Sequence, residues 1–474
     1  MSVANTHSHR RGIMRQFYAQ TLTTPYARPS RVRSDSRWVL VTVCLAVLLA
    51  QVDTSVINLA LRSVGLDLHA TVTGLQWVLD AYNLSYAVLL LTGGLLCDLY
   101  GRRRLFIFGA AIFTGGSVLC AAAPDIPLLI AGRTVAGAGA ALLLPASLAI
   151  IRVAWTEEQA RNRALGIWAA CNGLAFIIGP ALGGVLVDWF GWRSVFLIAV
   201  PLGVVAIAFA LRVVAESSDP AGRRFDAPGQ ILGAVALAGL ALTGIAGAHD
   251  HALATVACGV GLIALVLFLV IERRRGPAAM VPLELFRSHR FVGTLTATSA
   301  MTFGMYVVLF LVPLVWQSDG VFAAGTAGLA LTPMAAVFFV VSNASGRLVE
   351  SLGARVLIGG GTAVIGVGLL VIAWSVAGEP LWLSEIGLVL TGLGMGLNTG
   401  PLFGVAVAAV PATRSGSAAS LINVARMIGA TLGVAILGTA FALAGAGGAG
   451  LRAAMLLGGA VQVVGGAVAW RALR

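Results

Sequence analysis

Four ionisable side chains lie inside long apolar stretches of the chain, namely Asp53, Asp80, Arg133 and Arg426. Placing a charge in hydrocarbon costs about 2.5–3.5 kcal/mol on insertion scales, so each such residue is a candidate for function. A carboxyl group can take up and release a proton there, whereas arginine keeps its charge and can act only as a fixed partner. We therefore predict a proton-coupling site formed by Asp53, Asp80 and Arg133. The alternative is a permanent ion pair that holds three helices together.

Arg426 has no acidic residue near it in the sequence, and Asn423 lies three residues earlier, on the same face of a helix. One interpretation is that both side chains line a central cavity, where the guanidinium contacts polar or anionic groups. The other is that Arg426 donates hydrogen bonds to carbonyl groups of an interrupted neighbouring helix. The sequence supports both interpretations equally.

The composition of the 474-residue chain indicates whether it folds in water or in a membrane. Hydrophobic residues make up 58%, charged residues only 11%, and the mean hydropathy is +0.93. Soluble domains average about 45–50% apolar and about 25% charged residues, so this chain is predicted to be an integral membrane protein. All 31 basic residues are arginine, which excludes a P-loop ATPase, because that loop needs a lysine. We expect no enzymatic activity, catalytic site, metal or cofactor, since no nucleophile with a base and no metal-ligating cluster is recognisable.

Fourteen apolar segments are long enough to cross a bilayer, which takes about 20 residues each. With the N-terminus inside, 26 arginines fall in inner loops and tails and three in outer loops. This asymmetry predicts an even number of spans and two cytoplasmic termini. The predicted segments are 38–61, 74–97, 105–123, 126–151, 164–187, 194–213, 229–248, 252–271, 291–316, 324–345, 355–375, 382–410, 416–442 and 451–471.

Three of the buried charges have similar predicted depths. Asp53 lies eight residues from the outer end of the first segment, Asp80 six residues into the second and Arg133 seven residues into the fourth. At about 1.5 Å per residue, all three lie roughly 9–12 Å below the outer surface. A common depth favours a common site.

A short loop pattern of glycine, acid, glycine and base occurs twice, after the second and the tenth segments. We infer a duplicated unit of six helices, with two helices inserted between the copies. The predicted divisions are a basic cytoplasmic tail at 1–37, an N-terminal six-helix bundle at 38–213, two inserted helices at 229–271 and a C-terminal six-helix bundle at 291–471. The two copies comprise Gly94, Asp98, Gly101 and Arg102, and Gly346, Glu350, Gly353 and Arg355.

Three motifs resemble those of the major facilitator superfamily. The loop from Gly94 to Arg104 is similar to its G-x-x-x-D-x-x-G-R-[RK]-[RK] loop, and the segment from Arg133 to Pro145 looks like its second motif. The fifth segment is similar to the motif that characterises its antiporters. The matching residues there are Gly173, Gly179, Pro180, Gly183 and Gly184.

Other segments resemble the fourteen-span drug/proton antiporters of this superfamily. They are the stretches from Asp53 to Ala60, from Gln76 to Tyr82 and from Ser415 to Gly429. Arg62 departs from the pattern, because that family usually has a proline where the first helix ends.

The resemblance implies an all-α membrane protein with the major facilitator fold, in which two six-helix bundles are joined by two inserted central helices. It also implies that Gly94, Asp98, Gly101 and Arg102 form a conformational latch between the two halves. A basic turn that only fixes topology would contain the same residues. In the fifth segment Pro180 is expected to kink the helix, and its glycines allow either a rocking motion or simple close packing.

The implied function is secondary active export of small lipophilic or cationic drugs or antibiotics in exchange for protons, by alternating access. The proton gradient is then the energy source. We expect a multi-pass monomer in a bacterial cytoplasmic membrane, with no nucleic-acid partner. The alternatives are proton-coupled uptake or export of a specific metabolite, and a membrane receptor without transport activity.

Overall fold

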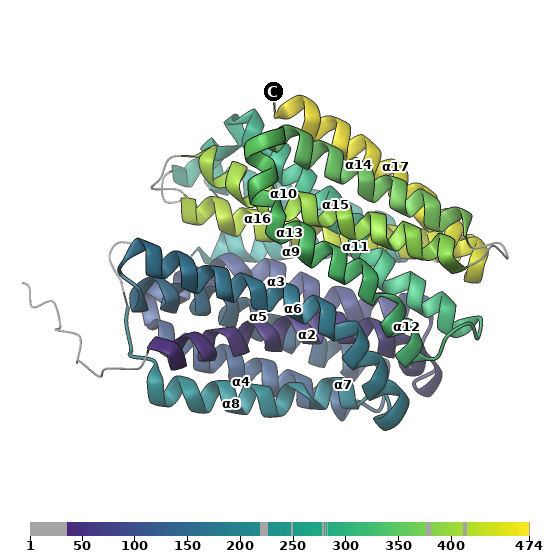
Figure 1. The fold of residues 1–474 in the computed structure, drawn as a ribbon, viewed down its shortest axis with the longest axis horizontal. Helices are drawn as coiled ribbons and strands as arrows, with labels where there is room; N and C mark the ends of the chain where they lie inside the picture. Colours follow the sequence, from purple (N-terminus) through teal and green to yellow (C-terminus); the bar gives the residue numbers. More distant parts are fainter. Residues whose placement is uncertain are drawn as a thin grey trace, which may run out of the picture.

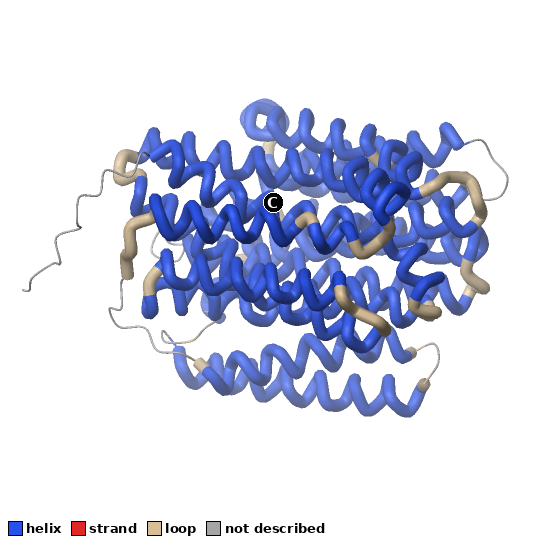
Figure 2. The backbone as a smooth tube through the Cα atoms, turned by 90° about the horizontal axis from the view of Figure 1, so that it is seen from below, coloured by secondary structure: helices blue, strands red, loops and turns tan. Residues whose placement is uncertain are grey.

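The computed structural model describes residues 36–218, 226–247, 250–276, 279, 281, 283–375, 381–410 and 415–473, so the predicted tail lies almost wholly outside the described residues. In that part of the chain every regular element is helical (Figure 2). Thirteen helical spans are long and apolar enough to cross a membrane, and α3 adds a further helix of 29 residues. The predicted all-α membrane fold is confirmed, and the number of long helices agrees with the fourteen predicted segments.

The chain forms two groups of helices, with a helix pair between them in sequence (Figure 1). The first group is α2 (Ser36–Asp67), α3 (Val72–Tyr100), α4 (Arg102–Ala121), α5 (Ile126–Ala154), α6 (Glu158–Phe190), α7 (Ser194–Leu197) and α8 (Ala199–Val213). The pair is α9 (Ala227–Ala246) and α10 (His251–Arg275), followed by the 3-10 helix η2 (Leu283–Arg287). The second group is α11 (His289–Ser318), α12 (Ala324–Ala330), α13 (Thr332–Leu352), α14 (Ala354–Trp374), α15 (Leu381–Ala408), α16 (Ser415–Leu443) and α17 (Gly447–Ala472).

Several of these helices are capped at their N-termini by short polar side chains. Thr71 accepts a hydrogen bond from the third residue of α3, and Asp125, Asp226 and Asp250 cap α5, α9 and α10 in the same way. Each side-chain oxygen satisfies one of the N–H groups that a helix leaves free at its start. These caps fix where the helices enter the bundle.

The repeated loop has the same backbone turn in both copies. Gly101 joins α3 to α4 with a φ of 107°, and Gly353 joins α13 to α14 with a φ of 81°. Both values lie in the region that glycine adopts readily and that strains other residues. The second glycine of the pattern therefore makes an abrupt change of chain direction between two spans.

The first helix is longer than predicted. Its predicted end was residue 61, yet α2 continues through Arg62 to Asp67. Arginine is a good helix former, so nothing in its backbone ends the helix where the related family has proline. The extra turn places the Asp67 carboxylate 2.7 Å from Arg193 and 2.9 Å from the indole nitrogen of Trp192.

Helix α9 contacts both groups of helices. Near its start, the side chain of Gln230 is hydrogen-bonded to the Val88 carbonyl and the Thr92 hydroxyl of α3. Near its end, the Gly244 carbonyl accepts a 2.8 Å hydrogen bond from Thr439 of α16. The inserted pair thus lies against one helix of each half.

A buried acidic cluster links the start of α9 to the end of α10. Asp226 accepts from Gly229 at 2.8 Å and pairs with Arg275 at 2.8 Å. Glu272, which is 1% exposed, accepts a 2.7 Å hydrogen bond from the backbone N–H of Val281. These bonds hold α9 to α10 and attach the segment that leads to α11.

Candidate functional site

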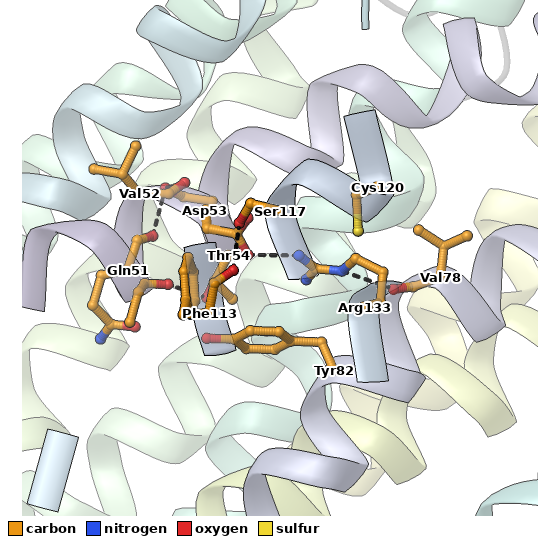
Figure 3. Close-up of polar contacts among 12 residues, drawn as sticks. Gln51, Val52, Asp53, Thr54, Val78, Tyr82, Phe113, Ser117, Cys120 and Arg133 are labelled. Atoms are coloured by element: carbon orange, nitrogen blue, oxygen red, sulfur yellow. Dashed lines mark hydrogen bonds and ion pairs between the residues drawn. The ribbon is translucent and has the colours of Figure 1, made fainter. Parts of the chain in front are cut away.

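Asp53 and Arg133 form a direct ion pair inside the first group of helices (Figure 3). Asp53 Oδ2 lies 2.6 Å from Arg133 Nη1, and their side chains are only 2% and 1% exposed. Arg133 Nε also donates to the Val78 carbonyl at 3.2 Å, and the guanidinium lies 4.4 Å from the centre of the Tyr82 ring. The structure therefore brings together two of the three residues predicted to couple protons.

The stability of this pair depends on the charges of both partners. Burying two charges costs several kcal/mol per ion, and their mutual attraction offsets that cost only while both charges are present. Loss of the negative charge of Asp53 would therefore weaken the link between α2 and α5. Arg133 then keeps the Val78 carbonyl and the Tyr82 ring as partners, so its charge stays partly compensated.

Asp80 lies apart from this pair. It is fully buried, and neither carboxyl oxygen has a hydrogen-bond partner among the described residues. Four residues earlier on the same face of α3, Gln76 donates to the carbonyls of Val434 and Ala435 in α16, at 2.9 and 3.1 Å. Asp80 therefore faces the second group of helices rather than the ion pair.

Thr431 is the residue of α16 that this register places opposite Asp80. The two helices run antiparallel, and Gln76 of α3 contacts Ala435 of α16. Asp80 lies four residues after Gln76, so it is level with Thr431, which lies four residues before Ala435. The Thr431 hydroxyl is also buried without a hydrogen-bond partner in the described part of the chain. A carboxyl group and a hydroxyl group are thus both unsatisfied at corresponding positions of two helices from different halves.

Arg426 and Asn423 lie on α16, where both are partly exposed. No carboxylate lies within 4.0 Å of the Arg426 guanidinium among the described residues, and its Nε is buried without a hydrogen-bond partner. Its neighbours on α16, Val424 and Met427, pack in one cluster with Tyr86 of α3 and Tyr306 of α11. Within the same part of the chain Arg426 donates to no backbone carbonyl, which disfavours the second of the two sequence-based interpretations.

The predicted latch makes contacts within its own half. Gly101 lies against the carboxylate of Glu216, just beyond α8, and that carboxylate accepts from the backbone N–H groups of Arg103 and Arg104 at 3.2 and 3.1 Å. The backbone N–H of Arg102 donates to the Ser217 carbonyl at 2.9 Å. Gly94 has open space beside it, and the side chain of Asp98 lies outside the described residues. A latch between the halves stays a prediction.

Glu216 is a residue that the sequence analysis missed. It caps the start of α4 from outside that helix, next to a run of three arginines. Its signal in the sequence is weak, namely one acid shortly after the sixth apolar segment. Only the fold shows that the end of α8 lies beside the start of α4.

The antiporter-type motif forms a closely packed seam on α6. Gly179 and Gly183 lie directly against Ser55 and Val56 of α2. A side chain at Gly184 would collide with the backbone of α12, and one at Gly173 would meet the ring of Phe339 on α13. The glycines thus bring α6 against helices of both halves.

A polar contact completes this seam. Asp188 Oδ2 accepts a 2.7 Å hydrogen bond from the backbone N–H of Gly325, at the start of α12. Pro180 lies inside α6, and its carbonyl is in close contact with Gly328 of α12. The two halves therefore meet backbone to backbone at this end of the bundle.

Comparison with known proteins agrees with this architecture. The sequence profile of the Major Facilitator Superfamily matches residues 43–434. The chain is 35% identical over 406 residues to the multidrug resistance protein Stp of Mycobacterium tuberculosis, covering 85% of this chain and 75% of that protein. It is 32% identical over 436 residues to the methylenomycin A resistance protein of Bacillus subtilis, covering 91% and 93%.

A solved structure shows the same fold. The xylose transporter XylE from E. coli, in a partially occluded inward-open conformation, superposes with a TM-score of 0.65 at 13% sequence identity, covering 92% of this chain and 99% of that chain. Because the family profile matches most of the sequence, the likeness reflects common ancestry as well as a shared fold. The chain belongs to the Major Facilitator Superfamily.

Proposed function

We propose that this protein exports small drugs or antibiotics across a bacterial cytoplasmic membrane in exchange for protons. The observation that carries the proposal is the buried Asp53–Arg133 pair, which would lose its ionic attraction if Asp53 took up a proton. The names of the relatives, which refer to multidrug resistance and to resistance to methylenomycin A, support a drug or antibiotic as substrate. The strong bias of arginines toward one side supports two cytoplasmic termini, and we propose a monomer as the working unit.

Contacts between the halves support alternating access. The described contacts of Gln76 with α16 and of Asp188 with α12 lie near the end of the bundle opposite the start of α2. At the other end, the contacts of Arg103 and Arg355 stay within their own halves. With the proposed topology this arrangement is closed toward the outside, and export requires the outer contacts to separate.

Replacing Gly184 by alanine is expected to shift the protein toward the outward-open state. The new methyl group would overlap backbone atoms of Ala324 and Gly325, which cannot move aside as a flexible side chain can. The measurement is the distance between spin labels placed at the outer ends of α6 and α12, which should lengthen in Gly184→Ala. Gly166→Ala is the matched control, because Gly166 lies on the same helix with open space beside it. Equal distance distributions in both variants would contradict the role of the seam.

Accumulation of ethidium in energised cells tests the proposed function. We expect cells with the wild-type protein to accumulate less ethidium than cells without it, and a protonophore or the Asp53→Asn substitution to abolish the difference. Greater accumulation with the wild type would indicate uptake instead. If a panel of antibiotics and ethidium shows no difference between wild-type and empty cells, export of drugs is wrong for this chain.

A further inference from the structure

We propose that Arg426, together with the hydroxyl groups of Tyr86 and Tyr306, binds an oxyanion of the transported molecule, such as a carboxylate or a phenolate. The inference rests on the proposed function and names the substrate class, namely lipophilic molecules with one acidic group. It departs from the expectation of cationic substrates, which was based on the two aspartates of the first half.

The charge balance of the interior favours an anion. The negative charge of Asp53 is neutralised by Arg133 at 2.6 Å. Asp80 is fully enclosed without a partner among the described residues, and an isolated buried carboxyl group is most stable in its neutral form. Arg426 is partly exposed and has no carboxylate within 4.0 Å in that part of the chain. Of the four deep charges, the accessible one is therefore positive.

The surrounding groups are hydrogen-bond donors. A guanidinium carries five N–H groups in a planar fork that matches a carboxylate, and a tyrosine hydroxyl can donate to the same oxygen atoms. Tyr86 comes from α3 in the first half, whereas Tyr306 and Arg426 come from α11 and α16 in the second. Helices α3 and α16 run antiparallel, and the contact of Gln76 with Ala435 places Tyr86 at the level of Arg426. An oxyanion bound here would contact both halves at once.

The walls of the site are apolar. Met427 and Val424 of α16 pack in the same cluster as Tyr86 and Tyr306, which suits a lipophilic body attached to the acidic group. Tyr86 also stacks on Tyr82 with a centroid distance of 6.2 Å, and Tyr82 lies beneath the Arg133 guanidinium. Two stacked rings thus connect the proposed binding site to the ion pair.

Three probes with the same pyrene body test the inference: 1-pyrenebutyrate, 1-pyrenebutanol and the pyrenebutyl-trimethylammonium cation. Binding to the full-length protein in nanodiscs is measured by energy transfer from tryptophan, with empty nanodiscs subtracted. We expect the wild type to bind the anion at least about tenfold more tightly than the alcohol, and Arg426→Gln to lose about tenfold for the anion alone. Tyr86→Phe and Tyr306→Phe should each lose about two- to fivefold for the anion.

Binding of pyrenebutanol, unchanged within about twofold, shows that each variant is folded, and Arg452→Gln is the matched control. Arg452 stacks on Trp374, away from the facing helices of the two halves. The inference is overturned if the wild type binds no probe, if it shows no preference for the anion, or if Arg426→Gln weakens all three probes equally.

Transport is measured separately, as proton-driven uptake of the probes into everted vesicles. An anion preference that depends on Arg426, without proton-driven uptake, would contradict the exporter and leave the binding site standing. Proton-driven uptake of pyrenebutanol without any anion preference would contradict the binding site alone.

Discussion

Replacing Arg133 by glutamine is expected to lower the free energy of unfolding by about 3–5 kcal/mol, because the buried Asp53 loses its ionic partner. The double variant Asp53→Asn, Arg133→Gln should regain most of that stability, since neither residue then carries a charge. Proton-driven ethidium export should be absent in both variants. Stability is measured by unfolding in sodium dodecyl sulfate from mixed micelles, and export in energised cells.

The double variant separates a structural ion pair from a coupling site. If the pair only holds α2 to α5, export should return together with stability. The matched control is Asp67→Asn, which breaks a 2.7 Å ion pair whose two side chains are 48% and 43% exposed. Surface pairs contribute about 0–1 kcal/mol, so this control should change stability little and leave export intact.

Replacing Asp80 by leucine is expected to stabilise the protein by about 1–3 kcal/mol while abolishing proton-driven export. The carboxyl group is fully buried without a hydrogen-bond partner in the described residues, so an apolar side chain of similar size removes an unsatisfied polar group. A residue kept at a cost in stability and needed for activity has the signature of a functional site. The measurements are unfolding in sodium dodecyl sulfate and ethidium accumulation.

Asn398→Leu is the matched control for Asp80→Leu. Asn398 is equally buried, but its side-chain amide lies 3.1 Å from the Thr362 hydroxyl, so this substitution should destabilise the protein. Normal export by Asp80→Leu would show that Asp80 has no coupling role. A large loss of stability in Asp80→Leu would contradict an unsatisfied carboxyl group at this position.

The sequence was most informative about position along the membrane normal. Counting residues from the ends of the apolar segments predicted that Asp53 and Arg133 share a depth, and the structure places them in contact. The same count put Asp80 beside them, although it faces α16. The depth of a residue in the membrane depends only on how many residues separate it from the end of its helix. The direction in which its side chain points depends on how that helix is rotated in the bundle. That rotation is fixed by neighbours such as the Gln76 contacts, which join residues far apart in the sequence.

Helix ends and loop contacts were less predictable for a related reason. Arg62 is compatible with either a helix end or a continuing helix, and the partners at Asp67, namely Trp192 and Arg193, lie far along the chain. Glu216 was missed because an acid after an apolar segment is common, and its contact with the start of α4 exists only in the folded protein. By contrast, the glycine pattern predicted a turn well, because the positive φ at Gly101 and Gly353 is a local property of the residue.

If the Asp53–Arg133 pair couples protons as proposed, it also sets when the membrane voltage can act on the protein. While both residues are charged, the pair has no net charge, so moving it through the electric field does no net electrical work. In the proposed cycle a proton on Asp53 leaves the pair with one net positive charge, on Arg133, and each elementary charge gains about 2.3 kcal/mol per 100 mV across the membrane. Under the proposed coupling, the voltage would drive the proton-loaded form inward and leave the unloaded form free to return.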